Sequence, residues 1–261
     1  MSESVYHSRE ETLEDLGRKG FRMIQRKDGF RFGEDTVLLS YFAAGVGPFL
    51  KRGTKALELG SGSGAASLLL AARRPDIHID GIEVDDTSFE VFSRNVRMNG
   101  LEEQIRPIHG DIRDFPDNKH VQRASYDFVF FNPPYRDPSR GLMTRSDTGS
   151  NSLLNARFEI LGGLGDFMKT ASEALRPGGM VVLVHRAVRL PEVMRIMPET
   201  GTEPIRVRMI YPQLESRATA FLLAGRKGGK PGGFTIEPPL ILRTEEMKMT
   251  EEMNKIYSNG D

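Results

Sequence analysis

Apolar segments alternate with amphipathic segments through the middle of the chain, and this alternation limits the possible folds more than any other feature. Short apolar runs predict five strands, at residues 55–59, 77–84, 105–109, 126–131 and 180–185. Helical spacing of apolar residues predicts three intervening helices, at 65–73, 86–99 and about 152–175. Strands that alternate with helices are typical of a mostly parallel sheet in an α/β domain.

Two more strands are predicted nearer the C-terminus, at residues 205–211 and 218–224, close enough in sequence to pair antiparallel. The expected fold is therefore a central, mostly parallel seven-stranded sheet with an antiparallel last strand and helices on both faces. Smaller elements are predicted outside this sheet: a helix at 35–44, a hairpin or loop at 29–33, a turn at 176–179 and a helical tail at 244–257.

Composition narrows the function classes. The chain has 261 residues and no cysteine, which excludes a disulfide scaffold, a thiolate metal site and a cysteine nucleophile. Its five histidines show no metal-ligand spacing, so no metal is expected. We find no membrane-spanning apolar run and no signal peptide, and we expect a cytoplasmic protein.

The formal net charge is zero, but the charges are unevenly distributed. Acidic residues dominate 1–17, whereas 18–31 contains six basic residues against Asp28. Such a patch can attract phosphates, although a solvated face is the commoner explanation. A glycine-rich basic loop is predicted at 225–233. We therefore divide the chain into an N-terminal extension (1–50), a main domain (51–225) and a C-terminal loop with a helical tail (226–261).

A glycine-rich turn joins the first predicted strand to the first helix. It begins at Glu58 and contains Gly60, Gly62 and Gly64. Glycines there let the backbone approach a ligand closely and leave helix N–H groups free to bind it. Glu83 ends the next strand, where a carboxylate can accept both hydroxyls of a ribose. The pattern predicts a nucleotide-type ligand, although similar turns without a ligand are common.

Asp111 follows the third strand. An acid at the carboxyl end of that strand could accept a hydrogen bond from an adenine amino group. A lone aspartate at such a position is more often a helix cap.

The fourth strand ends in Asn132-Pro133-Pro134-Tyr135. Two prolines fix the backbone and remove two donors, so the Asn132 amide oxygen and the Pro133 carbonyl can point into a cleft as acceptors. An amino group conjugated to a ring needs two acceptors for its two hydrogens. Tyr135 offers a ring on which a flat group can stack. The combination predicts a site that grips a planar amine.

The residues from Ala56 to Gly64, with Glu83, Asp111 and Asn132–Tyr135, resemble the motif series of the class I, S-adenosylmethionine-dependent amino-methyltransferases. This resemblance covers about residues 50–225 and implies a Rossmann-like fold. More narrowly, residues 29–42 and the C-terminal segments resemble the bacterial tRNA(Val) adenine-N6 methyltransferase family. That family implies S-adenosylmethionine as cofactor and a single-stranded tRNA loop as substrate.

The resemblance also implies roles for individual residues. The expected cofactor-binding residues are Glu58, Gly60, Ser61, Gly62, Gly64, Glu83, Val84, Asp111, Ile112 and Asn132. The expected catalytic residues are Asn132, Pro133, Pro134 and Tyr135. Substrate would contact Tyr135, Arg136 and Arg145, with Arg140 and the basic segment 18–31 near RNA phosphates. Residues 32–38 would cover the methionine end of the cofactor.

The motif set leaves alternatives open. The Asn-Pro-Pro-Tyr motif is shared by enzymes that methylate adenine N6, guanine N2 and glutamine N5, so it does not identify the acceptor. Glutamine-N5 enzymes usually carry a longer helical N-terminal domain than the roughly fifty residues that precede the glycine turn here. A nicotinamide-dependent oxidoreductase or a non-catalytic RNA-binding relative would also fit parts of the pattern. The chain is expected to be a monomer or a homodimer.

Overall fold

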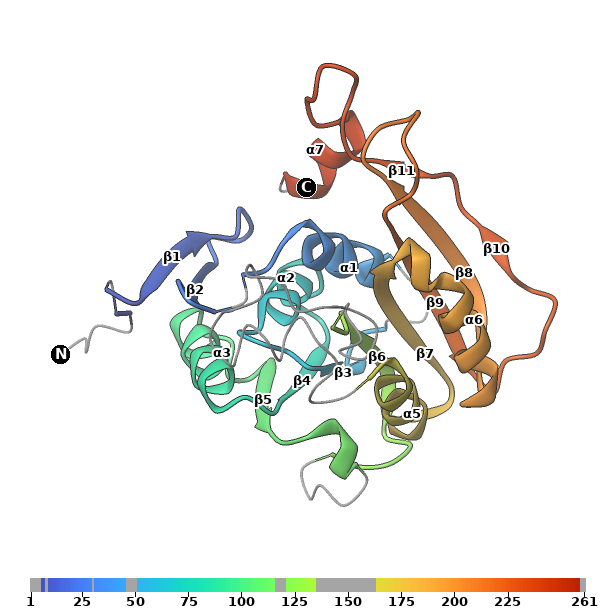
Figure 1. Ribbon diagram of the computed structural model, residues 1–261. Coiled ribbons are helices and arrows are strands. Elements are labelled where there is room, and N and C mark those ends of the chain that lie inside the picture. Colours follow the sequence, from blue (N-terminus) through green and yellow to red (C-terminus); the bar gives the residue numbers. More distant parts are fainter. Residues whose placement is uncertain are drawn as a thin grey trace.

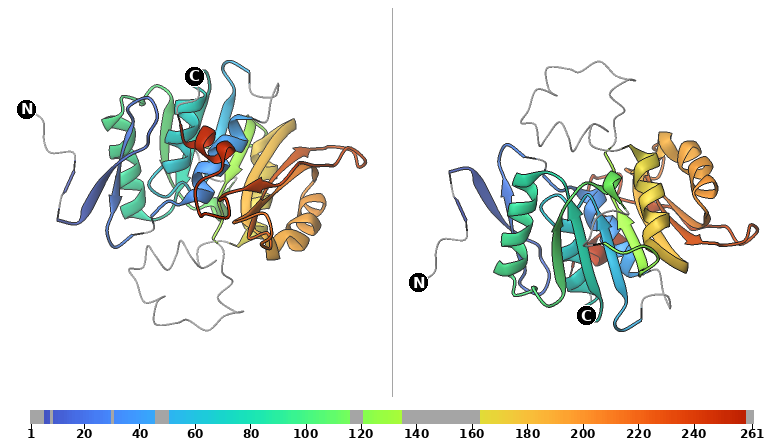
Figure 2. Two further views of the ribbon diagram at one scale, coloured as in Figure 1. Left: turned by 90° about the horizontal axis from the view of Figure 1, so that it is seen from above. Right: turned by 90° about the horizontal axis from the view of Figure 1, so that it is seen from below.

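The computed structural model describes residues 6–7, 9–29, 31–45, 51–115, 121–134 and 163–258. In this part of the chain, nine strands form one sheet, with helices on both of its faces (Figures 1 and 2). The sheet strands are β3 (Lys55–Leu59), β4 (His78–Glu83), β5 (Ile105–His109), β6 (Tyr126–Phe131), β7 (Leu175–Arg186), β8 (Thr202–Tyr211), β9 (Ala220–Lys227), β10 (Thr235–Ile236) and β11 (Leu240–Ile241). The helices are α1 (Glu34–Ala44), α2 (Ala65–Arg73), α3 (Asp86–Met98), α5 (Leu164–Ala174), α6 (Leu190–Glu199) and α7 (Glu251–Tyr257), with short 3-10 turns at Ile112–Asp114 (η2) and Ala187–Arg189 (η5).

The strand order confirms the predicted α/β sheet. Strands run in the order β5-β4-β3-β6-β7-β9-β8, and the short strands β10 and β11 pair with β8. All neighbouring pairs are parallel except those of β9, which is antiparallel to both β7 and β8. The chain builds outward from β3 to β5, then returns to place β6 on the other side of β3. This reversal creates a crevice between β3 and β6 at their carboxyl ends, where α/β sheets bind ligands.

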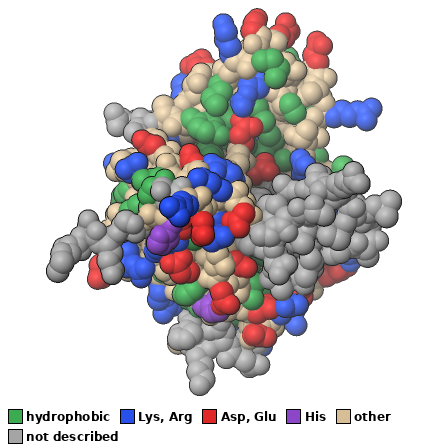
Figure 3. Space-filling model, turned by 60° about the vertical axis from the view of Figure 1, so that its left-hand side comes forward, with side chains coloured by type: hydrophobic (Ala, Val, Ile, Leu, Met, Phe, Trp, Pro, Cys, Tyr) green, Lys and Arg blue, Asp and Glu red, His purple; other side chains and the backbone are tan. Residues whose placement is uncertain are grey.

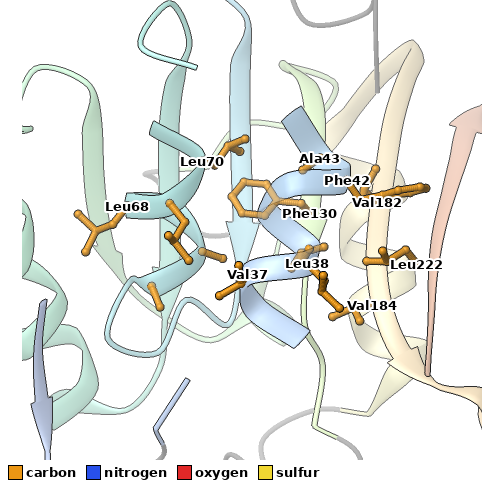
Figure 4. Close-up of a cluster of buried hydrophobic side chains, with 14 of the residues drawn as sticks. Val37, Leu38, Phe42, Ala43, Leu68, Leu70, Phe130, Val182, Val184 and Leu222 are labelled. Carbon is orange, nitrogen blue, oxygen red and sulfur yellow. The ribbon is translucent and has the colours of Figure 1, made fainter. Parts of the chain in front are cut away.

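Side-chain alternation along the strands produces two buried layers. Ala56 and Phe130 point toward α1, α2 and α3, whereas Leu57 and Phe131 point toward α5 and α6. Figure 4 shows part of the first layer, where side chains from α1 and α2 pack on β6, β7 and β9. Because both faces are covered, the central strands are apolar on both sides.

Most element predictions agree with the structure, and several differ. β7 begins at Leu175, so the expected turn at 176–179 is part of an irregular strand start, with a register shift against β6. The tail is helical only from Glu251, where the Thr250 side chain caps α7. Residues 29 and 31–33 form a loop, which is one of the two predicted alternatives. The sequence reading missed α6, the short strands β10 and β11, and a hairpin of β1 (Glu11–Asp15) and β2 (Arg22–Arg26).

The β1–β2 hairpin lies beside α3, at the end of the sheet away from β8 (Figure 1). Asn95 of α3 accepts a hydrogen bond from the Ile24 N–H at 2.7 Å and donates to the Ile24 carbonyl at 3.0 Å. The same side chain donates to the Ser63 carbonyl in the glycine turn at 2.9 Å. Buried Glu11 pairs with Arg94 of α3 at 2.5 Å. One helix therefore positions both the hairpin and the glycine turn.

Parts of all three sequence regions contribute to one buried layer. Leu38 of α1 and Ile256 of α7 belong to the same hydrophobic cluster as Phe130 and Val182 of the sheet. The division at residues 50 and 225 stays a prediction about organisation along the chain. Among the described residues, no helix is long and apolar enough to cross a membrane.

Candidate functional site

The main candidate site is a pocket at the carboxyl ends of β3, β4 and β6. The glycine turn, the end of β4 and the proline corner after β6 all line it. Of the predicted site residues, it is lined by Glu58, Gly60, Ser61, Gly62, Glu83, Val84, Ile112, Asn132, Pro133 and Pro134. The topology thus brings together three motifs, the first and last of which, at Gly60 and Asn132, are more than 70 positions apart along the chain.

The glycine turn forms the floor of the pocket. Gly60, Gly62 and Gly64 all have positive φ angles, of 65°, 55° and 88°. A Cβ on Gly62 would meet no heavy atom within 4 Å, so this glycine keeps a space in the pocket empty. A Cβ on Gly64 would instead overlap the Phe92 ring at 2.1 Å. Gly62 therefore makes room for a ligand. Gly64 is not among the residues lining the pocket, and it makes room for the Phe92 ring.

Glu58 places a carboxyl group in the buried floor of the pocket. It lies on the face of β3 that is covered by α2, and the Ser67 hydroxyl of α2 donates to it. Burial raises the pKa of Glu58 to about 8, and the charge of Glu83 adds to the rise. Because a nearby cation would favour ionisation, this carboxyl suits the ammonium group of a ligand.

We expect the stability of the ligand-free protein to fall as the pH rises from about 4.5 to about 8 through Glu58. In this window the folded chain keeps the Glu58 proton and the unfolded chain has lost it, so raising the pH favours unfolding. Glu58→Gln should flatten this part of the profile, by on the order of a few kcal/mol at pH 8. Urea unfolding at several pH values measures the change, with the exposed Glu103→Gln as control. Parallel profiles for Glu58→Gln and the parent would contradict the assignment.

Glu83 shapes the wall of the pocket beside the glycine turn. Its carboxylate accepts hydrogen bonds from the N–H groups of Gly62 at 2.7 Å, Val84 at 3.0 Å and Asp85 at 2.8 Å. Burial raises the pKa of Glu83, and the three backbone bonds oppose this. A carboxylate has about four acceptor positions, so these bonds leave room for one further donor.

Asp111 makes the contacts of a helix cap, the alternative that the sequence left open for it. Its carboxylate caps η2 through the Arg113 N–H at 2.8 Å and pairs with the Arg113 guanidinium. Although burial opposes the change, these contacts hold the pKa of Asp111 below its usual value. Its neighbours Gly110 and Ile112 line the pocket, but Asp111 is not among the lining residues. An adenine contact through its side chain remains a prediction that would compete with Arg113.

The proline corner lines the same pocket as the glycine turn, at the end of the neighbouring strand. Buried β6 delivers Asn132 and Pro133 to the carboxyl edge of the sheet, directly after Phe131, whose ring lies 5.4 Å from that of Phe167. Pro133 is buried and Asn132 is half-buried. Three predicted substrate residues, Tyr135, Arg136 and Arg145, lie outside the described residues, as does Arg140.

The structure adds residues to the site that sequence reasoning did not assign to it. Arg26 of β2 and Gly29 line the pocket from the hairpin side, and Phe167 lines it from α5. Phe32 and Thr36 also line it, and both belong to the segment 32–38 that is predicted to cover the methionine end of the cofactor. The aromatic ring of Phe167 approaches the position of a Cβ on Gly60 to 3.2 Å. The spacing of apolar residues in the predicted helix indicates only that Phe167 is buried.

Within the described part of the chain, no group of three or more His, Cys, Asp or Glu side chains could hold a metal ion. The pocket is lined instead by the carboxyl groups of Glu58 and Glu83, the first turn of α2 and the residues of the proline corner.

Comparison with known proteins places the whole arrangement in context. The family model for the methyltransferase small domain matches residues 36–199. A relative from Aeromonas hydrophila, named tRNA1(Val) (adenine(37)-N6)-methyltransferase, is 26% identical over 80% of this chain and 82% of its own length. A relative of the same name from Porphyromonas gingivalis is 30% identical over 67% of this chain and 66% of its own length.

Solved structures show the same fold. A predicted O-methyltransferase from Agrobacterium tumefaciens superposes with a TM-score of 0.66 at 20% identity, covering 85% of this chain and 95% of that one. TYW2 from Pyrococcus horikoshii, in complex with MeSAdo, superposes with a TM-score of 0.56 at 16% identity, covering 86% of this chain and 74% of that one. At these identities the likeness concerns the fold alone.

Proposed function

We propose, on the premise that this chain belongs to the methyltransferase small domain family, that it methylates the N6 amino group of an adenine in a tRNA anticodon loop. The observation that carries the proposal is that the proline corner and the glycine turn line one pocket. The corner suits a planar amine, and the turn suits a nucleoside-like cofactor. The names of the relatives identify a tRNA as their substrate and adenine 37, next to the anticodon, as the methylated base.

S-adenosylmethionine is the cofactor we propose. The residues present fit it: the empty space above Gly62 accommodates a ligand, and buried Glu58 suits its ammonium group. Glu83 has an acceptor position left for a ribose hydroxyl, and the backbone around Ile112 lines the adenine end. We also propose that Ser61, Val84 and Asp111 contact the cofactor, as the resemblance implies.

When bound, S-adenosylmethionine supplies an electrophilic methyl group to a nitrogen nucleophile. Asn132 and Pro133 provide two acceptors for the hydrogens of the target amine. These bonds favour a tetrahedral nitrogen, whose lone pair is then free of the ring and can attack the methyl carbon. S-adenosylhomocysteine is the leaving group, and the methylated nitrogen releases its extra proton to water. Since the proline pair fixes the backbone, the acceptors are preorganised, and orientation of this kind can supply about 7–11 kcal/mol in favourable systems.

The target base must leave its stack to reach this pocket. Unstacking costs a few kcal/mol in a duplex and less in a loop, which favours a single-stranded target. Tyr135 is proposed to stack on the flipped base, and Arg136 and Arg145 to contact the RNA. A tRNA substrate places the reaction in the cytoplasm.

The acceptor is tested by methyl transfer with labelled S-adenosylmethionine. We expect label in transcribed tRNA-Val and N6-methyladenosine in its nucleosides by mass spectrometry. A transcript with guanosine in place of the adenosine just 3′ of the anticodon should take up about 100-fold less label, because the target amine is absent. Label in N2-methylguanosine would overturn the adenine assignment. Label in protein glutamine, with none in RNA, would overturn the RNA assignment.

A further inference from the structure

A second, basic hollow lies at the other end of α1 and α2 from the catalytic pocket. It is lined by Arg18 and Lys19 of the hairpin turn, Arg73 at the end of α2, and Arg206 and Arg208 of β8. The rings of Tyr41 and Phe42 form part of its wall. We name it the basic hollow. Of its residues, only Arg18 and Lys19 belong to a predicted site, the basic segment 18–31.

The charges in the basic hollow do not balance. Arg206 pairs with Glu237 at 3.1 Å, and Arg208 pairs with Glu252 at 2.7 Å. Arg18 and Arg73 instead donate to backbone carbonyls at the end of α7, including Ile256. Among the described residues, no Asp or Glu forms an ion pair with Arg18, Arg73 or Lys19. Within the described part of the chain, three cations therefore share one hollow without a carboxylate partner.

This arrangement is costly without an anion. Arg18 is only 8% exposed, and Arg73 is half-buried. Burial lowers the pKa of Arg73 to about 10, and the charge of Arg18 lowers it further. The carbonyl end of α7 offsets only about half of one charge. A buried cation that is not neutralised is expensive, so an anion in the hollow would be stabilised.

The geometry of the cations suits phosphate more than a single carboxylate. The guanidinium of Arg73 stands over the Tyr41 ring at 5.5 Å, and that of Arg206 over the Phe42 ring at 4.3 Å. Contact with an aromatic ring limits the positions that these groups can take, and a guanidinium can present paired donors to phosphate oxygens. Lys19 adds an exposed charge at the rim.

The same elements build both sites. α2 runs from Ala65 in the catalytic pocket to Arg73 in the hollow, a rise of about 12 Å at 1.5 Å per residue. α1 contributes Thr36 to the first and Tyr41 to the second. On the premise of the proposed RNA methylation, we propose that the basic hollow binds a backbone phosphate of the RNA whose target base occupies the catalytic pocket.

The basic segment 18–31 supports this narrower site. Most of its charge is locally balanced: Arg26 pairs with Asp28 at 2.9 Å, and Arg31 with Glu14 at 2.5 Å. Figure 3 brings the hairpin side forward and shows Lys and Arg mixed with Asp and Glu over this face. Arg18 and Lys19, which line the hollow, are among the basic residues of the segment that pair with no carboxylate of the described residues.

Lys19→Asn tests the proposal with little risk to folding. Lys19 is exposed and has a φ of 52°, which asparagine tolerates. Binding of a fluorescent tRNA-Val anticodon stem-loop is measured over a series of salt concentrations. We expect weaker binding, by about threefold to tenfold at low salt, and a salt slope smaller by about 0.7–0.9. Arg73→Gln should add to the loss, and exposed Lys230→Asn is the matched control.

Inorganic phosphate provides the second arm, read as thermal stabilisation at constant ionic strength. Stabilisation of the parent by phosphate, lost in both hollow variants together with RNA affinity, supports the proposal. If both hollow variants lose stabilisation by phosphate but bind RNA as tightly as the parent, the hollow binds a free anion and the proposal is overturned. Equal salt slopes for Lys19→Asn and Lys230→Asn also overturn it. Absent methylation with intact RNA binding contradicts the proposed function alone, and a parent that binds no RNA contradicts both.

Discussion

Replacing Asn132 by alanine should lower the rate of methyl transfer by about 100-fold or more while changing the affinity for S-adenosylmethionine by less than about threefold. The Asn132 amide oxygen is one of two proposed acceptors for the target amine, and both lie at the proline corner. Without this oxygen, the amine loses one of the two contacts that make its lone pair available to the methyl donor. The proposed cofactor contacts come mainly from the glycine turn and Glu83, and the substitution leaves the hydrogen bond between them in place.

Single-turnover methylation of tRNA-Val and calorimetric titration with the cofactor separate the two effects. Exposed Asn254 of α7, replaced by alanine, serves as the control for a lost asparagine side chain. Asn132→Asp keeps an oxygen acceptor but adds a charge, and should lie between the parent and the alanine variant. A normal turnover rate in Asn132→Ala would remove this residue from its assigned role. An equal loss of rate and cofactor affinity would make it a cofactor ligand instead.

The sheet and the glycine turn could be predicted because their signals are local. β3, β5 and β6 have the predicted bounds, and so does α2, which begins directly after Gly64. Each strand is short, apolar and bounded by turn residues, so packing and propensity favour the same structure. The convergence of the glycine turn and the proline corner then followed from parallel topology.

The hairpin and its part of the site could not be predicted, because long-range contacts determine them. β1 and β2 are polar strands, and their link to α3 depends on Asn95, 71 positions from Ile24. No local pattern in the sequence pairs these residues. Asp111 illustrates a second limit: its pairing with Arg113 two positions away is a local cap, which a motif reading cannot distinguish from a ligand contact.

Gly64→Ala should destabilise the fold by about 3–5 kcal/mol, a large fraction of the about 5–15 kcal/mol typical of domains. The φ of 88° is one cause, since left-handed backbone costs a side chain about 1–2 kcal/mol. The larger cause is that the new Cβ would lie 2.1 Å from the Phe92 ring. The ring has little room to retreat, because it packs closely against Gly81 of β4, where a built Cβ would lie 2.6 Å from it.

Gly62→Ala is the matched comparison, because it carries the same change two residues away in the same turn. Its Cβ would enter open space in the pocket, so only backbone strain of about 1–2 kcal/mol is expected. It should instead weaken S-adenosylmethionine binding, by about tenfold or more, because the methyl group fills ligand space. Urea unfolding and cofactor titration should therefore rank the two variants in opposite orders. Since Phe92→Leu relieves the overlap, it should restore part of the stability of Gly64→Ala in a double-mutant cycle and none of that of Gly62→Ala. Equal losses of stability in both variants would mean that Phe92 does not set the requirement for glycine at position 64.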